Sequence, residues 1–254
     1  MVIMKKLQML IMPLLLILTG CTVFYETTRP AAPQLTTFLP DHKLLVKQPP
    51  EFPFYYFWEK KDIDWNKYDK VYVAPVNTDY LLKNTWWESV DPKALVNIKK
   101  NIPGLAEYMR SRFISRLSRV ESRGNFKVVD SPEMPGTLSL ELALTKLIPT
   151  KAELNYLGTA GGFFLPGAGM AASMASAGHV SMGCKLIDPK TGELLMMYAD
   201  REDDPSALIN LAGFCWYNAA KDNIDMWARQ TAAMAVVSRL QDVQRDFPFQ
   251  LIKY

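Results

Sequence analysis

Histidine and cysteine are scarce in this sequence, which has two histidines and three cysteines among 254 residues. His42 and His179 lie far apart, and neither belongs to a Cys-x-x-Cys or His-x-x-x-His pattern that could hold a structural metal ion. The serine-hydrolase motif G-x-S-x-G, the zinc motif H-E-x-x-H and the Walker phosphate loop are also missing. The sequence therefore predicts no metal ion, no cofactor and no enzyme of these classes.

A strong excess of one charge sign is missing as well. The chain has 29 Lys and Arg against 26 Asp and Glu, a net charge of +3 that does not by itself indicate nucleic acid as a partner. Its 49% hydrophobic and 22% charged residues exclude an intrinsically disordered chain. The length suits one sizeable domain or two small ones.

The first twenty residues have the pattern of an export signal. Lys5 and Lys6 precede an apolar run at residues 7–18, which is shorter than the ~20 residues that span a bilayer. Residues 18–21, Leu-Thr-Gly-Cys, resemble the lipobox of bacterial lipoproteins, which implies cleavage after residue 20 and acylation of Cys21. A plain N-terminal anchor helix is the alternative. Cleavage would remove two lysines and no acid, leaving 27 basic and 26 acidic residues.

The resemblance to lipoproteins also implies a cellular location. Thr22 follows Cys21, and by bacterial sorting rules a residue other than Asp at this place implies the outer membrane, with the domain facing the periplasm. Residues 21–37, with Pro30 and Pro33, are expected to form the lipidated end and a tether reaching up to about 50 Å when extended. Residues 38–45 are more apolar and are expected to dock on the domain.

Hydrophobic alternation predicts the strands of this domain, at residues 71–76, 126–129, 137–146, 180–187 and 193–199. The leucines at alternate positions of residues 137–146 predict a strand buried on one face only. Residues 188–192, Asp-Pro-Lys-Thr-Gly, predict a hairpin turn between the last two strands. The aromatic residues at 52–58 indicate packing, with carbohydrate stacking as the alternative.

Two helices are predicted. Asp91 and Pro92 suit a helix start, and apolar residues recur every three or four positions from 95 to 120. We expect a break at Pro103, an end near residues 124–125, and a second, largely buried helix at residues 225–243. These elements predict an α+β domain over residues 38–254. It would have a single mixed, mostly antiparallel sheet, a crossover helix and a C-terminal helix.

The two cysteines that follow Cys21 are candidates for a disulfide. Cys184 shares one face of a predicted strand with apolar residues, and Cys215 lies in an aromatic segment. An oxidising periplasm permits a bridge between them, which would stabilise the fold by about 3–4 kcal/mol in the loop-entropy model. Two buried free thiols are the alternative, because connectivity does not follow from sequence.

The least ordinary segment is a Gly- and Ala-rich insertion at residues 154–179, which has no charged residue after Glu153. Small residues let helices approach closely, so the segment could mediate self-association or enter a membrane. A long loop with a short helix over the domain's own core is the alternative. The small residues proposed for self-association are Gly158, Gly161, Gly162, Gly167, Ala168, Gly169, Ala172 and Ser176.

Four arginines, Arg112, Arg116, Arg119 and Arg123, recur along one flank of the long helix. Guanidinium groups suit phosphate or carboxylate, so the stripe could contact an anion or an acidic partner. A solvated face is the alternative, paired with the acidic residues at 202–204. Those acids and Asp200 are expected to form a turn at a strand end, and their spacing is not that of a calcium-binding loop.

The chain resembles a family of bacterial envelope lipoproteins, domain of unknown function 3313. The resemblance covers residues 36–243 and rests on residues 38–44, the strands at 68–76 and 137–145, the hairpin at 188–195, and the Trp-Ala pair at 227–228. His42 stands where the family usually has Tyr. The family has no assigned catalytic residues to carry over. The order of elements also resembles the amino-terminal domain of TolB and the periplasmic domain of CsgG.

Three functions stay open on the sequence. The first is a lipid-anchored, non-catalytic periplasmic module that binds another envelope component or itself, and it is the one we favour. The second is a periplasmic carrier of a small molecule or lipid on the hairpin face, which needs an apolar pocket. The third is a hydrolase with paired carboxylates, whose members need not be neighbours in sequence.

Overall fold

The computed structural model describes residues 29–81, 92–148, 179–203, 209–210, 218–237, 240–245 and 252–253. The larger of its two sheets has seven strands in the order β1-β2-β7-β6-β5-β3-β4. The strands are β1 (Val46–Lys47), β2 (Tyr56–Glu59), β3 (Lys70–Val73), β4 (Lys127–Val129), β5 (Thr137–Ile148), β6 (His179–Asp188) and β7 (Glu193–Asp203). A small parallel pair joins β8 (Ile209–Asn210) and β9 (Ile252–Lys253).

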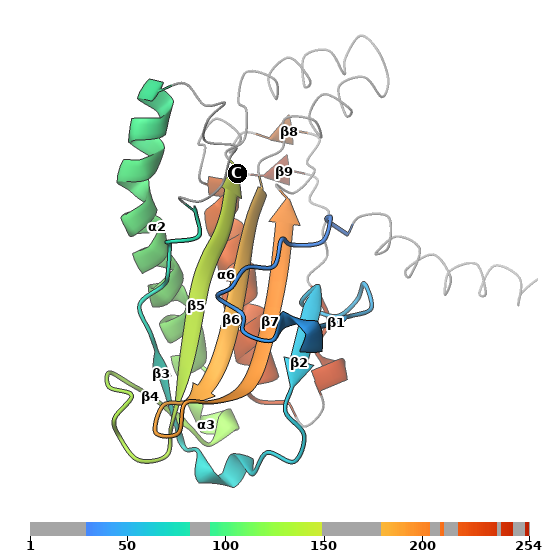
Figure 1. Ribbon diagram of the computed structural model, residues 1–254, viewed down its shortest axis with the longest axis vertical. Helices are drawn as coiled ribbons and strands as arrows, with labels where there is room; N and C mark the ends of the chain where they lie inside the picture. The colour runs from blue at the N-terminus through green and yellow to red at the C-terminus, as the bar shows by residue number, and fades with distance from the viewer. Residues whose placement is uncertain are drawn as a thin grey trace, which may run out of the picture.

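The sheet is mixed, as the sequence predicts. β3 is parallel to both β4 and β5, and every other neighbouring pair is antiparallel. The connection from β3 to β4 contains α2 (Pro92–Ser118), so the expected crossover helix is confirmed. Figure 1 shows α2 and α6 (Asn218–Met234) on one face of the sheet. The short helices are α3 (Glu121–Gly124), η1 (His42–Leu44), η2 (Trp65–Lys67) and η6 (Leu240–Asp242).

The long helix differs from the prediction at two places. α2 continues through Pro103, which lies on its exposed face. The helix ends at Ser118, earlier than expected, and α3 follows it with Asn125 in the left-handed conformation at its end. The apolar stripe is confirmed, because it buries Ile102, Leu105, Met109, Phe113 and Leu117.

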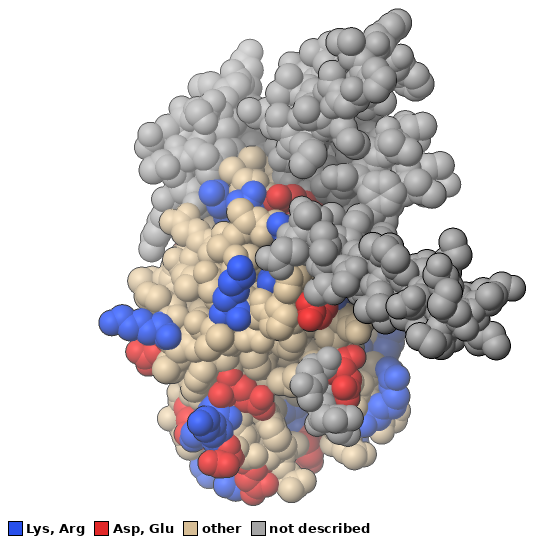
Figure 2. Space-filling view, turned by 90° about the vertical axis from the view of Figure 1, so that its right-hand side faces the viewer, with Lys and Arg blue, Asp and Glu red and all other residues tan. Residues whose placement is uncertain are grey.

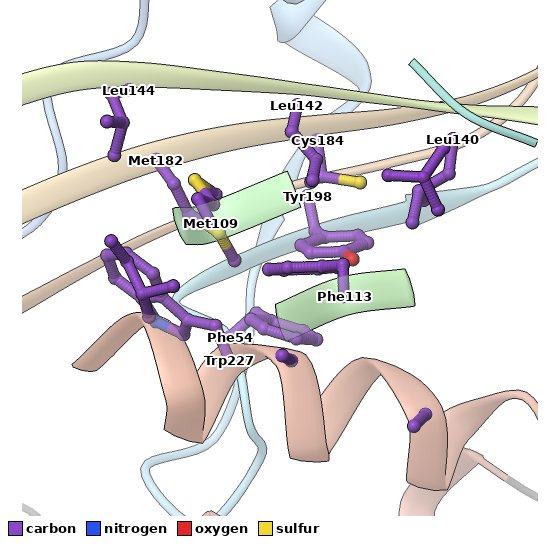
Figure 3. Packing of buried hydrophobic residues seen from close by; sticks show 14 of the residues in the cluster. Phe54, Met109, Phe113, Leu140, Leu142, Leu144, Met182, Cys184, Tyr198 and Trp227 are labelled. Atoms are coloured by element: carbon purple, nitrogen blue, oxygen red, sulfur yellow. The ribbon is translucent and has the colours of Figure 1, made fainter. Parts of the chain in front are cut away.

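The main core lies between the helices and the sheet. Figure 3 shows Met109 and Phe113 of α2 and Trp227 of α6 facing apolar side chains of β5, β6 and β7. Phe54 stacks on Tyr198 with 4.1 Å between the ring centroids, which confirms packing as the role of that aromatic residue. The hairpin of β6 and β7 is also confirmed, with Gly192 at φ +72° in its turn.

The expectation that the strand at residues 137–146 buries one face only is wrong. Its leucines face the helices, but Ala143 on the opposite face is also fully buried. The cause is the N-terminal segment, which crosses in front of β6 and β7 in Figure 1 and packs Phe38 and Leu39 against Ala143 and Met197. The predicted docking of residues 38–45 is therefore confirmed.

The close approach of this N-terminal segment depends on a glycine in β6. A Cβ atom at Gly183 would lie 3.1 Å from Cδ1 of Phe38 and 3.4 Å from Cγ of Leu39. Any larger side chain at this position would push the segment away from the sheet. The sheet is thus covered by helices on one face and by the N-terminal segment on the other.

The C-terminal helix begins and ends earlier than expected. α6 starts at Asn218 and stops at Met234, whereas the prediction placed it at residues 225–243. Asp225 is the residue at which the prediction began this helix. It lies instead in the second turn, where it pairs with arginines of α2. Val236 and Val237 follow the helix rather than continue it.

The covering segment yields a stability prediction. Replacing Leu39, which is almost fully buried, by alanine should reduce the free energy of unfolding by about 2–5 kcal/mol. Leu44 lies in the same segment but is 43% exposed, so Leu44→Ala should change it by about 0.5 kcal/mol or less. Urea unfolding followed by tryptophan fluorescence measures both. Equal effects of the two substitutions would contradict this packing.

Candidate functional site

Two buried carboxylates on β7 are the most unusual charged groups in the described chain. Asp200 and Glu202 are 4% and 6% exposed, and their positions, two residues apart, place both on the face of β7 that packs on α6. The predicted strand-end turn is wrong here, because β7 continues through Asp203. Asp204 lies outside the described residues.

Asp200 is held by two donors. The indole Nε1 of Trp227 donates to Oδ2 at 2.8 Å, and the backbone N–H of Tyr55 donates to Oδ1 at 2.9 Å. Burial raises the pKa of Asp200, although Arg245 and the two donors oppose this rise. The carboxylate therefore joins α6, β7 and the segment before β2.

Glu202 is bound by Arg245 in a bidentate ion pair. Nη2 of Arg245 lies 2.6 Å from each carboxylate oxygen, and Nε lies 3.0 Å from Oε1. The backbone N–H of Arg245 also donates to the carbonyl of Glu51 at 2.7 Å. Burial and the neighbouring Asp200 together raise the pKa of Glu202 against the effect of Arg245.

This pair is unsuited to the chemistry of a hydrolase. A general acid and base must reach a substrate and a water molecule, and a nucleophile needs an open path to the reacting atom. The oxygens of Asp200 and Glu202 are instead occupied by Trp227, Tyr55 and Arg245, and both side chains are buried. The arrangement ties elements of the fold together.

A second charged cluster joins α2 to α6. Asp225 accepts from Nε of Arg112 at 2.6 Å and from Nη2 of Arg116 at 2.8 Å, and Nη1 of Arg229 lies 2.8 Å from it. Burial alone would raise the pKa of Asp225, but the hydrogen bonds from Arg116 and Arg112 hold it below the ordinary value. One carboxylate thus contacts three guanidinium groups.

The predicted arginine stripe is divided by this cluster. Arg112 and Arg116 lie in the contact of α2 with α6, whereas Arg119 follows the end of α2 and Arg123 belongs to α3, both exposed. Their role as an anion or partner contact stays a prediction.

Glu202 and Asp203, two of the acidic residues that the alternative pairs with the arginine stripe, bind other arginines. Glu202 binds Arg245, and Asp203 accepts from Arg201 at 2.9 Å. The signal that could have located Asp225 is its spacing of four residues from Arg229, which is typical of an ion pair within a helix. Sequence reasoning missed Arg245 altogether, because it stands alone near the end of the chain.

The remaining predicted site residues are only partly described. Cys184 is buried in β6, and burial raises the pKa of its thiol. Cys21, Cys215 and every small residue proposed for self-association lie outside the described residues. Lipidation, the bridge and self-association therefore stay predictions.

Neither a metal site nor a membrane-spanning helix is found within the described ranges. No group of three or more His, Cys, Asp and Glu side chains there is arranged to hold a metal ion. None of the helices there is both long and apolar enough to cross a bilayer. His179, at the start of β6, is mostly buried, and this burial lowers its pKa to about 4.

Comparison with known proteins supplies a family. The sequence matches, over residues 34–231, the model of a family described as protein of unknown function (DUF3313). The chain belongs to this family. The resemblance that the sequence motifs indicate is thereby confirmed. No curated protein matches the chain.

Several solved structures are similar to the chain. A PelC variant dodecamer from Paraburkholderia phytofirmans has a TM-score of 0.40 and 12% identity, covering 71% of this chain and 98% of that chain. Another PelC dodecamer from the same organism gives 0.35 and 10%, with 68% and 96% covered. A neuraminyllactose-binding hemagglutinin homolog from Helicobacter pylori gives 0.33 and 10%, with 76% and 95% covered.

The α2–α6 cluster predicts a loss of stability without Asp225. In Asp225→Asn, the guanidinium groups of Arg112 and Arg116 lose their carboxylate at a partly buried contact, so the free energy of unfolding should fall by about 1–3 kcal/mol. Glu107→Gln, at an exposed position of α2, is the control and should change it by about 0.5 kcal/mol or less. Thermal and urea unfolding measure both, and an unchanged Asp225→Asn would contradict the role of this cluster.

The buried carboxylates predict a pH dependence. Burial raises the pKa of Asp200 from the ordinary 3.8 to about 6 and that of Glu202 from 4.5 to about 8 in the folded chain. Their contribution to stability is full below the ordinary values and is lost as pH rises through the raised ones.

We therefore expect the urea midpoint to fall between about pH 5 and 8. It should fall less in Asp200→Asn, because one of the two raised carboxyl groups is then removed and Glu202 loses the effect of the Asp200 charge on its pKa. Urea denaturation at a series of pH values across this range measures how the midpoint changes with pH in both proteins. Parallel profiles of the two proteins would contradict a raised pKa of Asp200.

Proposed function

We propose that the chain is a lipid-anchored lipoprotein of the bacterial outer membrane, facing the periplasm, that serves as a non-catalytic binding or assembly module. The observation that carries this proposal is the N-terminal segment, which is part of the fold itself. The predicted lipid attachment, Cys21, precedes the first described residue, Arg29, by eight positions. From Arg29 onward the chain packs on the domain.

Arg29 begins this attachment. Its Nη1 donates to the carbonyl of Gln48 at 2.5 Å, its Nη2 donates to the carbonyl of Phe54 at 3.3 Å, and its guanidinium lies 4.3 Å from the centroid of the Tyr55 ring. The fully extended chain from Cys21 to Arg29 therefore reaches at most about 29 Å, well short of the 50 Å that the sequence suggests. This lipid anchor would hold the domain close to the membrane.

The described residues support a module without catalysis. The acidic groups that could have served a hydrolase bind structural donors, and the hairpin face that a carrier would need is covered by Phe38 and Leu39. Contact with a partner would then use the outer surface. The candidates remain Arg119, Arg123 and the Gly- and Ala-rich insertion, toward an envelope component or a second copy.

The finer fold resemblance belongs to the same proposal. A kinship with the amino-terminal domain of TolB and the periplasmic domain of CsgG would fit an assembly role in the envelope. The mixed sheet with a crossover helix and a C-terminal helix is consistent with it. Shared fold does not fix function, so this support is weak beside the N-terminal attachment.

Substitution of Cys21 tests the proposed lipid anchor. Cells that make Cys21→Ala should show no palmitate in the protein, while Cys184→Ala, which removes a buried thiol of β6, should keep the label. Thr22→Asp should move the protein from the outer to the inner membrane fraction. A form exported behind a non-lipoprotein signal and beginning at Thr22 should be soluble and should capture an envelope component or itself. Palmitate in Cys21→Ala would contradict the anchor, and a monomer that binds no envelope fraction would contradict the module.

A further inference from the structure

The edge of the sheet at β1 exposes apolar side chains beside basic ones. Val46 and Leu44 are 60% and 43% exposed, although they are large apolar residues. Lys43 precedes Leu44 in η1 and Lys47 follows Val46 in β1, and both lysines are exposed. These four residues are called the β1 patch below.

The β1 patch lies where the tether reaches the domain. Arg29 donates to the carbonyl of Gln48, the neighbour of Lys47, and Nζ of Lys47 lies 5.6 Å from the same Tyr55 ring that Arg29 covers. The segment that leads to Cys21 therefore starts beside β1. The patch and the start of the tether share one edge of the sheet.

The length of the tether limits which surface can meet the membrane. A compact domain of this size is roughly 40–45 Å across. The chain from Cys21 to Arg29 reaches at most about 29 Å. This length is too short to pass around the domain and present the side opposite Arg29 to the bilayer. The surface around Arg29, which contains the β1 patch, is the one that the lipid anchor holds near the membrane.

We propose that the β1 patch rests on the membrane in which the chain is anchored. Leu44 and Val46 enter the headgroup region, and Lys43 and Lys47 contact the phosphates of anionic phospholipids. This inference rests on the proposed lipid anchor at Cys21. The anchor supplies the main attachment, and the patch fixes the orientation of the domain, because the tether raises its effective concentration at the bilayer.

The charges of this edge agree with such a contact. Figure 2 looks onto this side of the molecule and shows most of its Asp and Glu side chains toward the lower end, where Lys and Arg side chains also lie, and further basic side chains among uncharged residues in the middle. Asp41 and Glu51 are the acids close in sequence to the patch, and they are balanced by Lys43 and Lys47. The attraction is therefore modest, and the exposed apolar side chains carry the contact.

A photocrosslinking experiment tests this orientation. The full-length lipidated protein carries benzoyl-phenylalanine in place of Leu44, of Val46 or of Met134, in vesicles of phosphatidylethanolamine and phosphatidylglycerol. Met134 is the matched control, because it is 43% exposed like Leu44 but lies in the loop between β4 and β5, at the other edge of the sheet. We expect phospholipid adducts at positions 44 and 46, at least tenfold above those at 134.

The outcomes separate this inference from the anchor on which it rests. Lipid adducts at position 134 equal to those at 44, or protein dimers at positions 44 and 46 instead of lipid adducts, would overturn the membrane contact. Palmitate labelling of the same samples reports the anchor independently. A spacer of twenty Gly and Ser residues after Tyr25 should reduce the adducts at 44 and 46 several-fold, because it dilutes the patch at the bilayer.

Discussion

The packing of the N-terminal segment on the open face of the sheet is the contact on which the rest of the structure depends. Helices α2 and α6 cover one face only, and a central strand such as β5 has apolar or small side chains on both. Phe38 and Leu39 close the second face over Ala143 and Met197. Without them this apolar area would meet water at a cost of roughly 25 cal/mol for each Å².

A second constraint follows, because the segment just before β2 is held from three directions. Arg29 from the N-terminal segment donates to the carbonyl of Phe54, Arg245 from the C-terminal segment donates to the carbonyl of Glu51, and Asp200 of β7 accepts from the N–H of Tyr55. Asp200 thus connects β7 to the segment before β2, and Glu202 connects β7 to Arg245. Burying such carboxyl groups costs free energy, which their hydrogen bonds offset.

Hydrophobic periodicity in the sequence predicts most strands and helices, whereas contacts between residues distant in sequence determine the features that it misses. Strand β5, the hairpin of β6 and β7 and the apolar stripe of α2 follow from periodicity, and the structure confirms them. The burial of both faces of β5 does not, because it depends on Phe38 and Leu39, about 100 residues earlier. The start of α6 was also misplaced, since Asp225 lies inside the helix and binds arginines 109 and 113 residues earlier. The ion pair of Glu202 with Arg245 could not be predicted either, since the two residues lie 43 positions apart in the sequence.

In the proposed arrangement, the same covering segment would connect the lipid anchor directly to the fold. A pull on the predicted lipid at Cys21 would act on Arg29 and then on the layer formed by Phe38 and Leu39, with no long linker between them. A domain on a long linker samples all orientations, whereas this one, anchored as proposed, would present a restricted surface to the bilayer and the opposite surface to the periplasm. Partners of such a module would therefore meet it from the side away from β1, where α2, α3 and β4 lie (Figure 1). The exposed Arg119 and Arg123 belong to that side. These two arginines lie outside the α2–α6 contact and would therefore face such a partner.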